Sequence, residues 1–568
     1  MGPAISRLQV LAAAVLALVL LGFASPLGAT GMGHAPALDL DAGADSDGPD
    51  PLAPADAAGP APQAPGAPAS VSLATPGEGA DPVVAAARQA LRDAPPRIHK
   101  DDLAALVDFY AGVSQPVFVD ATGLTARGRL ASEEIARADD WGLKASAFDL
   151  PPAPVQGASP ESLAQAEVKL AAAVLTYARH ARGGRFEPVA ISRLFDQKPT
   201  IFDPRSLLRA AAANDALDAY LRDLHPRHAG FHTLRKALLA ARAAKADDAG
   251  DDKPPARRDD LRRILVNMER WRWLPADLGE FYVWDSVTEQ MTTVFEAGKP
   301  VLTERIVVGK PSSPTVMFSA DMQFVIFHPS WGVPPGMKAH ELGPKLRNTG
   351  GGWFSSNPAA SQVLAAHGLK VSRGGVPVDP DSIDWSKANV AGFDFTQAPG
   401  PRNVLGIVKF RFPNKHDIYM HDTPERHLFG GAVRAFSHGC MRVQNPVRLA
   451  EVILAYDKGY DAARTAEFVK RGGEIKLTKR VPVHITYFTA IADEEGKVRH
   501  LADLYGLDGR VASALEGQSV RISGVAAPAA AAAEERAEPR KKSERVVRKK
   551  AAPKEASLGD VFSSLIGN

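Results

Sequence analysis

The spacing of hydrophobic residues changes near Pro275, and this change divides the chain into two kinds of structure. Before Pro275, apolar residues recur every three or four positions, which is the period of an amphipathic helix. A Ser-Pro start and a Gly-Gly stop predict one helix over residues 160–182, and an Asp-Pro start predicts another from Pro204 toward Leu224. The pattern therefore predicts a mostly helical domain over residues 83–250.

After Pro275, short segments rich in β-branched and aromatic residues follow one another, mostly separated by Gly, Pro or Asn. The predicted strands cover residues 281–284, 301–308, 323–328, 404–412, 417–421 and 481–488. Residues 331–400 interrupt this pattern and are too long for an ordinary connection, so they form either a lid over a site or a disordered insertion. The sequence thus predicts an α+β protein whose second, mostly β domain covers residues 258–510.

The two ends of the chain differ from this middle part. Arg7, an apolar run and small residues predict an export signal over residues 1–30, which would act as an N-terminal anchor if it stays uncleaved. Residues 31–82 are rich in Ala, Pro, Gly and Asp and predict a disordered linker, and residues 525–568 predict a disordered basic tail. We expect a protein that leaves the cytoplasm, either released or anchored to the inner membrane. Its basic tail is either a solvated extension or a weak contact with an anionic envelope surface.

Composition narrows the classes of protein that fit. Hydrophobic residues make up 45% and charged residues 23% of the chain, which excludes a wholly disordered or fibrous protein and one built from many membrane spans. The net charge of +2 includes an acidic linker that has no Lys or Arg, so the folded part is mildly basic. A mildly basic surface suits an anionic polymer or a substrate with carboxylates. Nucleic acid is not an expected partner.

The chain has a single cysteine, Cys440, which excludes an internal disulfide and every metal site built on several cysteines. Ser437, His438, Gly439 and Arg442 lie within three positions of it, and inert core cysteines seldom have such polar neighbours. Nearby His, Arg or backbone N–H groups lower the pKa of a thiol and favour the nucleophilic thiolate. The glycine would let the backbone turn sharply, so that the amides of residues 439 and 440 point at a developing oxyanion.

A nucleophilic cysteine needs a base, and His421 is the predicted one. It ends the strand-like segment 417–421, and a strand, a loop and a second strand can bring it to Cys440. Asp422 follows directly, which suggests a Cys-His-Asp triad. Neighbouring residues of a strand point to opposite faces, however, so we expect a backbone carbonyl and not this carboxylate to orient His421.

Two other chemistries fit the residue types less well. The clustered metal-binding types are His416, His421, His427, His438 and Cys440. Structural zinc usually has tighter paired ligand spacing, and a zinc site built from histidines would leave the thiol unexplained. A papain-like peptidase places its cysteine well over a hundred residues before its histidine, whereas here only His484 and His500 follow Cys440. No metal and no cofactor are expected.

His421, followed after a loop by Ser437-His438-Gly439-Cys440-Met441-Arg442, resembles the catalytic signature of the L,D-transpeptidases, the YkuD-type domain. Residues 266–275 and 412–424 are similar to the large periplasmic YcbB-like subgroup. The resemblance covers residues 260–505 strongly and residues 85–245 more loosely, as the helical scaffold of that subgroup. Many of its members carry a small peptidoglycan-binding module, but here only a charged break at residues 245–258 occupies that place.

The resemblance implies a helical scaffold followed by a β-sandwich catalytic domain, with residues 331–400 as its capping insertion. Cys440 would be the nucleophile and His421 the general base. The residues that would shape the site and the oxyanion hole are Ser437, His438, Gly439 and Arg442. The candidates for lining the lid are Trp331, Trp353 and Phe354.

The implied reaction joins peptidoglycan stem peptides. The thiolate would attack the amide after diaminopimelate in a tetrapeptide donor and release D-Ala. The side-chain amine of a second diaminopimelate would then take the acyl group, giving a 3→3 cross-link, and carbapenems would inhibit covalently. Water as the acceptor would make the protein an L,D-carboxypeptidase, and a catalytically silent wall-binding protein is the other alternative.

Overall fold

The computed structural model describes residues 80–247, 255–349 and 357–520. The predicted export signal, nearly all of the acidic linker and the basic tail lie outside these residues, as do Trp353 and Phe354. Among the helices that the structure describes, none is long and apolar enough to cross a membrane.

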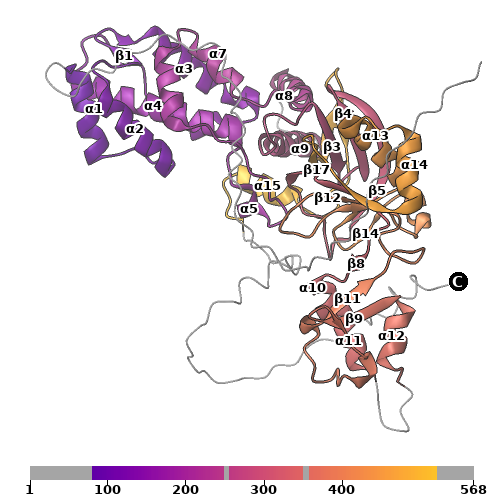
Figure 1. Cartoon of the computed structure of the whole chain (residues 1–568). Coiled ribbons are helices and arrows are strands. Elements are labelled where there is room, and N and C mark those ends of the chain that lie inside the picture. Colours follow the sequence, from indigo (N-terminus) through magenta and orange to yellow (C-terminus); the bar gives the residue numbers. More distant parts are fainter. Residues whose placement is uncertain (1–79, 248–254, 350–356, 521–568) are drawn as a thin grey trace, which may run out of the picture. The chain divides into compact units, whose positions relative to one another are not determined.

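The N-terminal part is mostly helical (Figure 1). Its elements are α1 (Pro82–Asp93), α2 (Lys100–Gly112), β1 (Val119–Asp120), β2 (Gly123–Leu124), α3 (Ala126–Ala136), η1 (Ala138–Trp141), η2 (Ala145–Ala147), α4 (Pro160–Gly183), α5 (Pro188–Ile191), α6 (Pro204–Ala213), α7 (Leu217–Asp223) and α8 (Ala229–Asp247). The helix predicted at residues 160–182 is confirmed, because Ser159 accepts the N–H of Ser162 at 3.3 Å and starts α4 as its N-cap.

The single helix predicted from Pro204 toward Leu224 is wrong, because two helices occupy this stretch. Between α6 and α7, the side-chain oxygen of Asn214 accepts the N–H of Ala216 at 2.9 Å. A local bond of this kind competes with the helical backbone pattern and breaks the helix.

One buried carboxylate organises the helical part. Glu167 on α4 is fully buried and accepts four hydrogen bonds. The donors are the Tyr110 hydroxyl at 2.7 Å and the backbone N–H groups of Val117, Phe118 and Val119 at 2.8, 2.8 and 3.0 Å. Since these donors come from α2 and from the segment leading into β1, the carboxylate ties three parts of the chain together.

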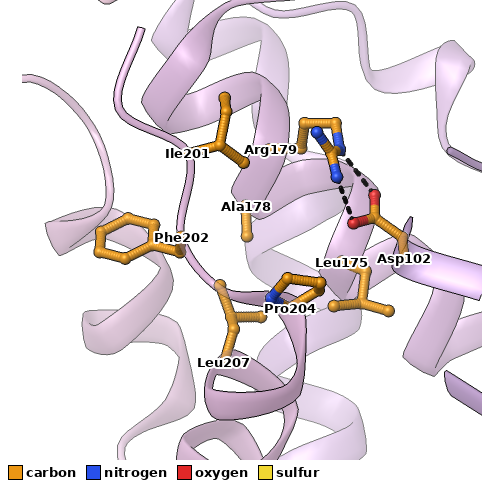
Figure 2. A pocket seen from close by; sticks show the side chains of 8 residues that line it. All are labelled: Asp102, Leu175, Ala178, Arg179, Ile201, Phe202, Pro204 and Leu207. Carbon is orange, nitrogen blue, oxygen red and sulfur yellow. Dashed lines mark hydrogen bonds and ion pairs between the residues drawn. The ribbon is translucent and has the colours of Figure 1, made fainter. Parts of the chain in front are cut away.

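A small hollow near α4 is closed at one end by an ion pair (Figure 2). Arg179 on α4 donates to both carboxylate oxygens of Asp102 on α2, at 2.8 and 2.6 Å. The other lining residues are Leu175, Ala178, Ile201, Phe202, Pro204 and Leu207. Apart from this paired Asp and Arg, the lining has no titratable side chain, so the hollow is a packing feature between α2, α4 and α6.

The C-terminal part is built on one large sheet. Its elements are α9 (Pro255–Arg272), β3 (Phe281–Ser286), β4 (Met291–Glu296), β5 (Lys299–Gly309), β6 (Ser319–Asp321), β7 (Phe324–Phe327), β12 (Val408–Arg411), β13 (Met420–His421), η6 (Arg426–Gly430), β14 (Ala435–Ser437), β15 (Met441–Val443), α13 (Pro446–Lys458), α14 (Ala462–Arg471), β16 (Gly473–Lys476), β17 (Pro482–Thr486), β18 (Ala490–Ala492), β19 (Val498–His500) and α15 (Asp508–Leu515). Within the described residues this sheet has 11 strands in the order β16-β7-β12-β13-β15-β5-β4-β3-β17-β6, with β14 on β5.

The long strand β5 joins the two halves of this sheet. Its first part pairs with β4, and its last residues pair with β15 and β14. Buried residues of both halves, such as Val294 on β4 and Val408 on β12, belong to one hydrophobic core, which α13 and α14 also join. The predicted α+β class is therefore confirmed, as a helical domain followed by a curled sheet whose halves enclose a common core.

The segment 331–400 is folded where the structure describes it. Its elements are β8 (Trp331–Gly332), α10 (Pro335–Met337), η3 (Lys338–Leu342), α11 (Gly343–Arg347), α12 (Ala360–Ala366), β9 (Leu369–Arg373), β10 (Val376–Pro377), η4 (Pro380–Ser382), η5 (Val390–Gly392) and β11 (Asp394–Gln397). The strands form a separate sheet in the order β10-β9-β11-β8, over a separate core that includes Leu346, Trp385 and Phe395. The described part of the insertion thus has its own sheet and core.

Candidate active site

Cys440 and His421 lie on neighbouring strands. β13 and β15 pair in parallel with His421 opposite Arg442, which places Cys440 opposite Tyr419. Side chains alternate along a strand, so residues two positions apart project from the same face. Tyr419, His421, Cys440 and Arg442 therefore share one face of the sheet, so the predicted nucleophile and base lie on the same face of neighbouring strands.

His421 is buried, and one nitrogen of its ring is fixed. Nδ1 contacts the backbone carbonyl of Asp422. This confirms that a carbonyl orients the ring, and it leaves Nε2 as the nitrogen that accepts a proton. Burial lowers the pKa of His421 to about 3, helped by the positive charges of Arg442 and Lys409. The ring is therefore neutral near pH 7.

The Asp422 carboxylate has another task. Its Oδ2 accepts the N–H of Ile407 at 2.9 Å, and its Oδ1 pairs with Arg426 at 2.7 Å. Gly406, which precedes Ile407, has a φ of +59°, and a Cβ there would lie 2.2 Å from the carboxylate oxygen. The carboxylate therefore holds this turn, and Cys440, His421 and Asp422 do not form a triad.

The Cys440 thiol is half-buried, and its Sγ lies 3.5 Å from the carbonyl oxygen of Asp417. Burial raises the pKa of this thiol to about 11, although Tyr419, Lys409 and Arg442 act in the opposite direction. The expectation that the neighbours lower the pKa of Cys440 overall is therefore wrong, because desolvation outweighs them. At rest the site holds a neutral thiol and a neutral imidazole.

The turn before Cys440 is held by the side chain of Ser437. Ser437 Oγ accepts the N–H of Gly439 at 3.1 Å and donates to the carbonyl of Cys440 at 2.5 Å. Gly439 has a φ of +116°, which an L side chain rarely adopts. Since its N–H is bound to Ser437, the Gly439 amide does not point at an oxyanion as predicted, and of the two predicted amides the Cys440 N–H is the one left for that role.

His438 and Arg442, two further predicted site residues, each contact an acidic side chain. His438 is exposed, and its Nε2 lies 2.9 Å from Glu341 of the insertion and 3.2 Å from Lys310 Nζ. Arg442 contacts the Glu425 carboxylate, and it lies opposite His421 in the sheet. His438 thus contacts the insertion, whereas Arg442 contributes positive charge beside the base.

Two residues outside the predicted set belong to this face. Tyr419 interacts through its side chain with both Cys440 and Trp331, and burial raises its pKa well above its ordinary value. Lys409 on β12 lies opposite His421, with its Nζ 4.0 Å from the centre of the Tyr419 ring. The alternation along residues 417–421 could have indicated Tyr419, but Lys409 depends on a strand pairing that the sequence does not reveal.

Trp331, the one lid candidate within the described residues, begins the insertion on β8 and pairs with Gln397 on β11. Its interaction with Tyr419 places it beside the site. Trp353 and Phe354 lie outside the described residues.

Two of the histidines among the candidate metal ligands contact acidic side chains. His416 Nε2 lies 2.8 Å from Asp196, and His438 contacts Glu341. Within the part of the chain that the structure describes, no group of three or more His, Cys, Asp or Glu side chains could hold a metal ion.

The comparisons with known proteins agree with this geometry. The family model of the L,D-transpeptidase catalytic domain, YkuD, matches residues 280–485, and that of the Scaffold domain matches residues 104–238. A Haemophilus influenzae protein classed by name with the L,D-transpeptidases is 29% identical over 254 residues, which are 44% of this chain and 48% of that protein. The chain therefore spans about half the length of this curated relative.

Solved structures give a weaker comparison. An L,D-transpeptidase in complex with imipenem aligns at 13% identity and a TM-score of 0.18, over 36% of this chain and 59% of that one. A mutant of the Enterococcus faecium L,D-transpeptidase aligns at 12% identity and a TM-score of 0.16, over 37% and 50%. The family models and the curated relative identify the catalytic domain.

The match to the L,D-transpeptidase catalytic domain points to a cysteine-dependent transpeptidase, and the structure places a cysteine and a neutral histidine on one face of its sheet. The chain carries an L,D-transpeptidase catalytic domain of the YkuD type over residues 280–485, preceded by a Scaffold domain. Its place in the YcbB-like subgroup stays a prediction.

Proposed function

We propose that this protein is a peptidoglycan L,D-transpeptidase that forms 3→3 cross-links through an acyl-enzyme on Cys440. The observation that carries the proposal is the half-buried thiol on the same sheet face as a neutral His421. A neutral imidazole can accept the proton of the thiol, and a half-buried thiol is reachable by a peptide carbonyl.

The reaction begins as Cys440 attacks the carbonyl of diaminopimelate in the donor tetrapeptide. Because the thiol and the imidazole are both neutral at rest, His421 Nε2 takes the thiol proton while the sulfur–carbon bond forms. The tetrahedral intermediate then collapses, the carbon–nitrogen bond breaks, and His421 returns the proton to the departing D-Ala amine. A thioester remains on Cys440.

The acceptor amine of a second stem peptide attacks this thioester, its proton goes to His421, and the thiol is regenerated. Lys409 and Arg442 give this face positive charge, which supports binding of the carboxylates of the stem peptides. Trp331 at the edge of the site supports a role for the insertion in keeping water from the thioester.

The proposed function is tested by incubating the purified full chain with imipenem and with disaccharide-tetrapeptides, followed by intact-mass and product analysis. We expect a covalent imipenem adduct, absent in Cys440→Ala, and a cross-linked dimer from the tetrapeptides. Tripeptide without dimer would identify a carboxypeptidase. Absence of every adduct would contradict an acyl-enzyme and favour a silent wall-binding protein.

We further propose that the protein acts in the periplasm, released or held by its N-terminal segment. The expected export pattern of residues 1–30 supports this location. Cell fractionation of the tagged full chain tests it, and a cytoplasmic signal would contradict it.

A further inference from the structure

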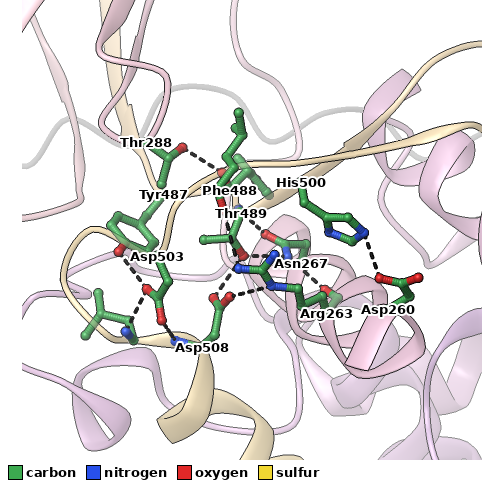
Figure 3. Close-up of polar contacts among 12 residues, drawn as sticks. Asp260, Arg263, Asn267, Thr288, Tyr487, Phe488, Thr489, His500, Asp503 and Asp508 are labelled. Atoms are coloured by element: carbon green, nitrogen blue, oxygen red, sulfur yellow. Dashed lines mark hydrogen bonds and ion pairs between the residues drawn. The ribbon is translucent and has the colours of Figure 1, made fainter. Parts of the chain in front are cut away.

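The segment that follows the matched catalytic domain is anchored to α9 by a buried polar network (Figure 3). The Asn267 side chain donates to Thr489 Oγ1 at 3.0 Å, and this hydroxyl donates to Asp508 at 2.9 Å. Arg270, also on α9 and buried, donates to the same Asp508 oxygen at 2.7 Å. Residues 486–515, which lie beyond the family match, are thereby fixed on α9, and α9 joins the core of the large sheet through Val266.

Within this segment, Asp503 holds a tight turn. The Tyr487 hydroxyl donates to its carboxylate at 2.7 Å, as do the N–H groups of Leu507 and Asp508 at 2.8 and 2.9 Å. The Tyr487 hydroxyl also accepts the N–H of Tyr505 at 2.6 Å, and the two tyrosine rings stack with centres 5.5 Å apart. Tyr505 is therefore held from its backbone and from one face of its ring.

The hydroxyl of Tyr505 is connected through Thr315 to the turn at residues 437–440. It donates to the carbonyl of Gly309 at 2.7 Å and accepts the N–H of Thr315 at 3.2 Å. Thr315 Oγ1 in turn accepts the N–H of Gly309 at 2.9 Å and donates to the carbonyl of Gly439 at 2.8 Å. Thr315 is fully buried, so these bonds have no competition from water.

This arrangement sets the direction of one amide. The carbonyl of Gly439 and the N–H of Cys440 belong to the same peptide unit, and in a trans peptide they point in opposite directions. A carbonyl held inward by Thr315 therefore turns the Cys440 N–H away from Thr315. The other amide of the turn, that of Gly439, is already bound to Ser437.

We propose that Thr315 and Tyr505 are positioning residues that aim the Cys440 N–H at the oxyanion formed during acyl transfer. The proposal rests on the proposed acyl-enzyme function and deepens it. It assigns part of the oxyanion stabilisation to Tyr505, a residue outside the matched catalytic domain. Neither residue touches the substrate, and both act through the Gly439 carbonyl.

The first test compares the maximal rate and the half-saturating concentration of imipenem acylation in full-length variants. Removing an oxyanion donor costs roughly 100-fold or more, so its misorientation in Tyr505→Phe should slow the maximal rate by about 10-fold. The half-saturating concentration should stay unchanged. Thr315→Val should have a larger effect, and Thr315→Ser, which keeps the hydroxyl, should restore a rate within about 3-fold of wild type.

Tyr282→Phe is the matched control, because it removes a hydroxyl from a partly buried tyrosine elsewhere in the same domain. It should acylate at the wild-type rate. If Thr315→Val fails to fold, Tyr505→Phe carries the test, since its ring can still stack on Tyr487.

The second test separates the amide from the thiol. Alkylation of Cys440 by iodoacetamide forms no oxyanion, so Tyr505→Phe should leave this rate within about 2-fold of wild type while acylation falls. An unchanged acylation rate in Tyr505→Phe would overturn the proposal, and so would an equal loss of both reactions, which would mean that Tyr505 places the thiol. If wild type itself forms no acyl adduct but is alkylated, the proposed function fails instead.

Discussion

Two regions of this protein bury titratable side chains, but the side chains of the two regions differ in how many hydrogen-bond partners they have. In the helical domain, the Glu167 carboxylate accepts four hydrogen bonds at 2.7 to 3.0 Å. In the catalytic domain, His421 is fixed through one ring nitrogen, and the Cys440 thiol interacts with Tyr419 and lies 3.5 Å from the Asp417 carbonyl oxygen. The first group is saturated with partners, whereas the second pair keeps reactive atoms available.

This difference separates residues that stabilise the fold from residues that carry out the reaction. Substitution of a buried carboxylate with all its donors in place strongly lowers the free energy of unfolding, because removing its charge leaves four oriented donors poorly bound. A thiol and an imidazole that make fewer hydrogen bonds contribute less to the free energy of unfolding. Substitutions in the two regions should therefore fail in different assays.

The largest expected effect is the decrease in the imipenem acylation rate when His421 is substituted. His421→Gln removes the base, so imipenem acylation should slow by about 1,000-fold while the free energy of unfolding changes by less than about 1 kcal/mol. Mass spectrometry of the adduct over time, with urea unfolding in parallel, measures both. His484→Gln is the matched control, because His484 is another buried histidine whose pKa burial lowers to about 4. Wild-type acylation by His421→Gln would refute the assignment of the base.

The next largest effect is on the free energy of unfolding and comes from Asp285 on β3. This side chain differs from both Glu167 and the Cys440–His421 pair. It is fully buried, and burial raises its pKa to about 7. The folded state therefore holds a proton that the unfolded state releases near pH 4, so this group stabilises the fold at low pH and loses that effect as the pH rises from about 4 to 7. A shift of this size corresponds to about 4 kcal/mol.

Urea unfolding at several pH values measures this dependence. In Asp285→Asn the decrease between about pH 4 and 7 should be smaller than in wild type, while the exposed control Asp277→Asn should follow wild type. Identical curves for Asp285→Asn and wild type would show that Asp285 does not carry the proton.

A somewhat smaller effect is expected at Glu167. Glu167→Gln replaces the charged acceptor of four donors and should lower the free energy of unfolding by about 3 kcal/mol. Acylation per folded molecule should not change. Chemical unfolding and adduct formation below the transition measure the two quantities, with exposed Glu133→Gln on α3 as the control. A variant that is stable but inactive would erase the contrast between the regions.

The smallest expected effect is the pH dependence of acylation. An ordinary histidine with a pKa near 6.5 would lose about 30-fold of its neutral form between pH 8 and pH 5. Since the pKa of His421 is lowered to about 3, the ring stays neutral over this range, and the imipenem acylation rate should vary by less than about 3-fold. A descending limb near pH 6.5 would contradict the buried neutral base.

The sequence predicted the parts that depend on local signals. The Ser-Pro start of α4, the β-rich runs and the motif around Cys440 can each be recognised within a few residues. The orientation of His421 by a carbonyl also followed from the alternation of side chains along a strand. Asn214 shows the limit, because its bond to Ala216 ended a helix that the hydrophobic period would have continued.

What escaped prediction depends on pairing over long distances in the chain. Lys409 lies beside His421 through strand register, and Tyr505 reaches Gly309 from nearly 200 positions later. The pKa of Cys440 also could not be predicted correctly, because the cationic neighbours are visible in the sequence but the extent of burial is not. Register and burial are properties of the assembled fold.

Helix α9 determines how much of the chain has to be kept together. Val266 joins the core of the large sheet, whereas Ile264 and Met268 on the same helix join a second core with Phe231 and Leu234 of α8. A fragment cut at the edge of the family match would lose this shared helix and expose the apolar surfaces on which it packs. The smallest piece able to fold and react by itself should therefore begin at or before α9 and extend through α15.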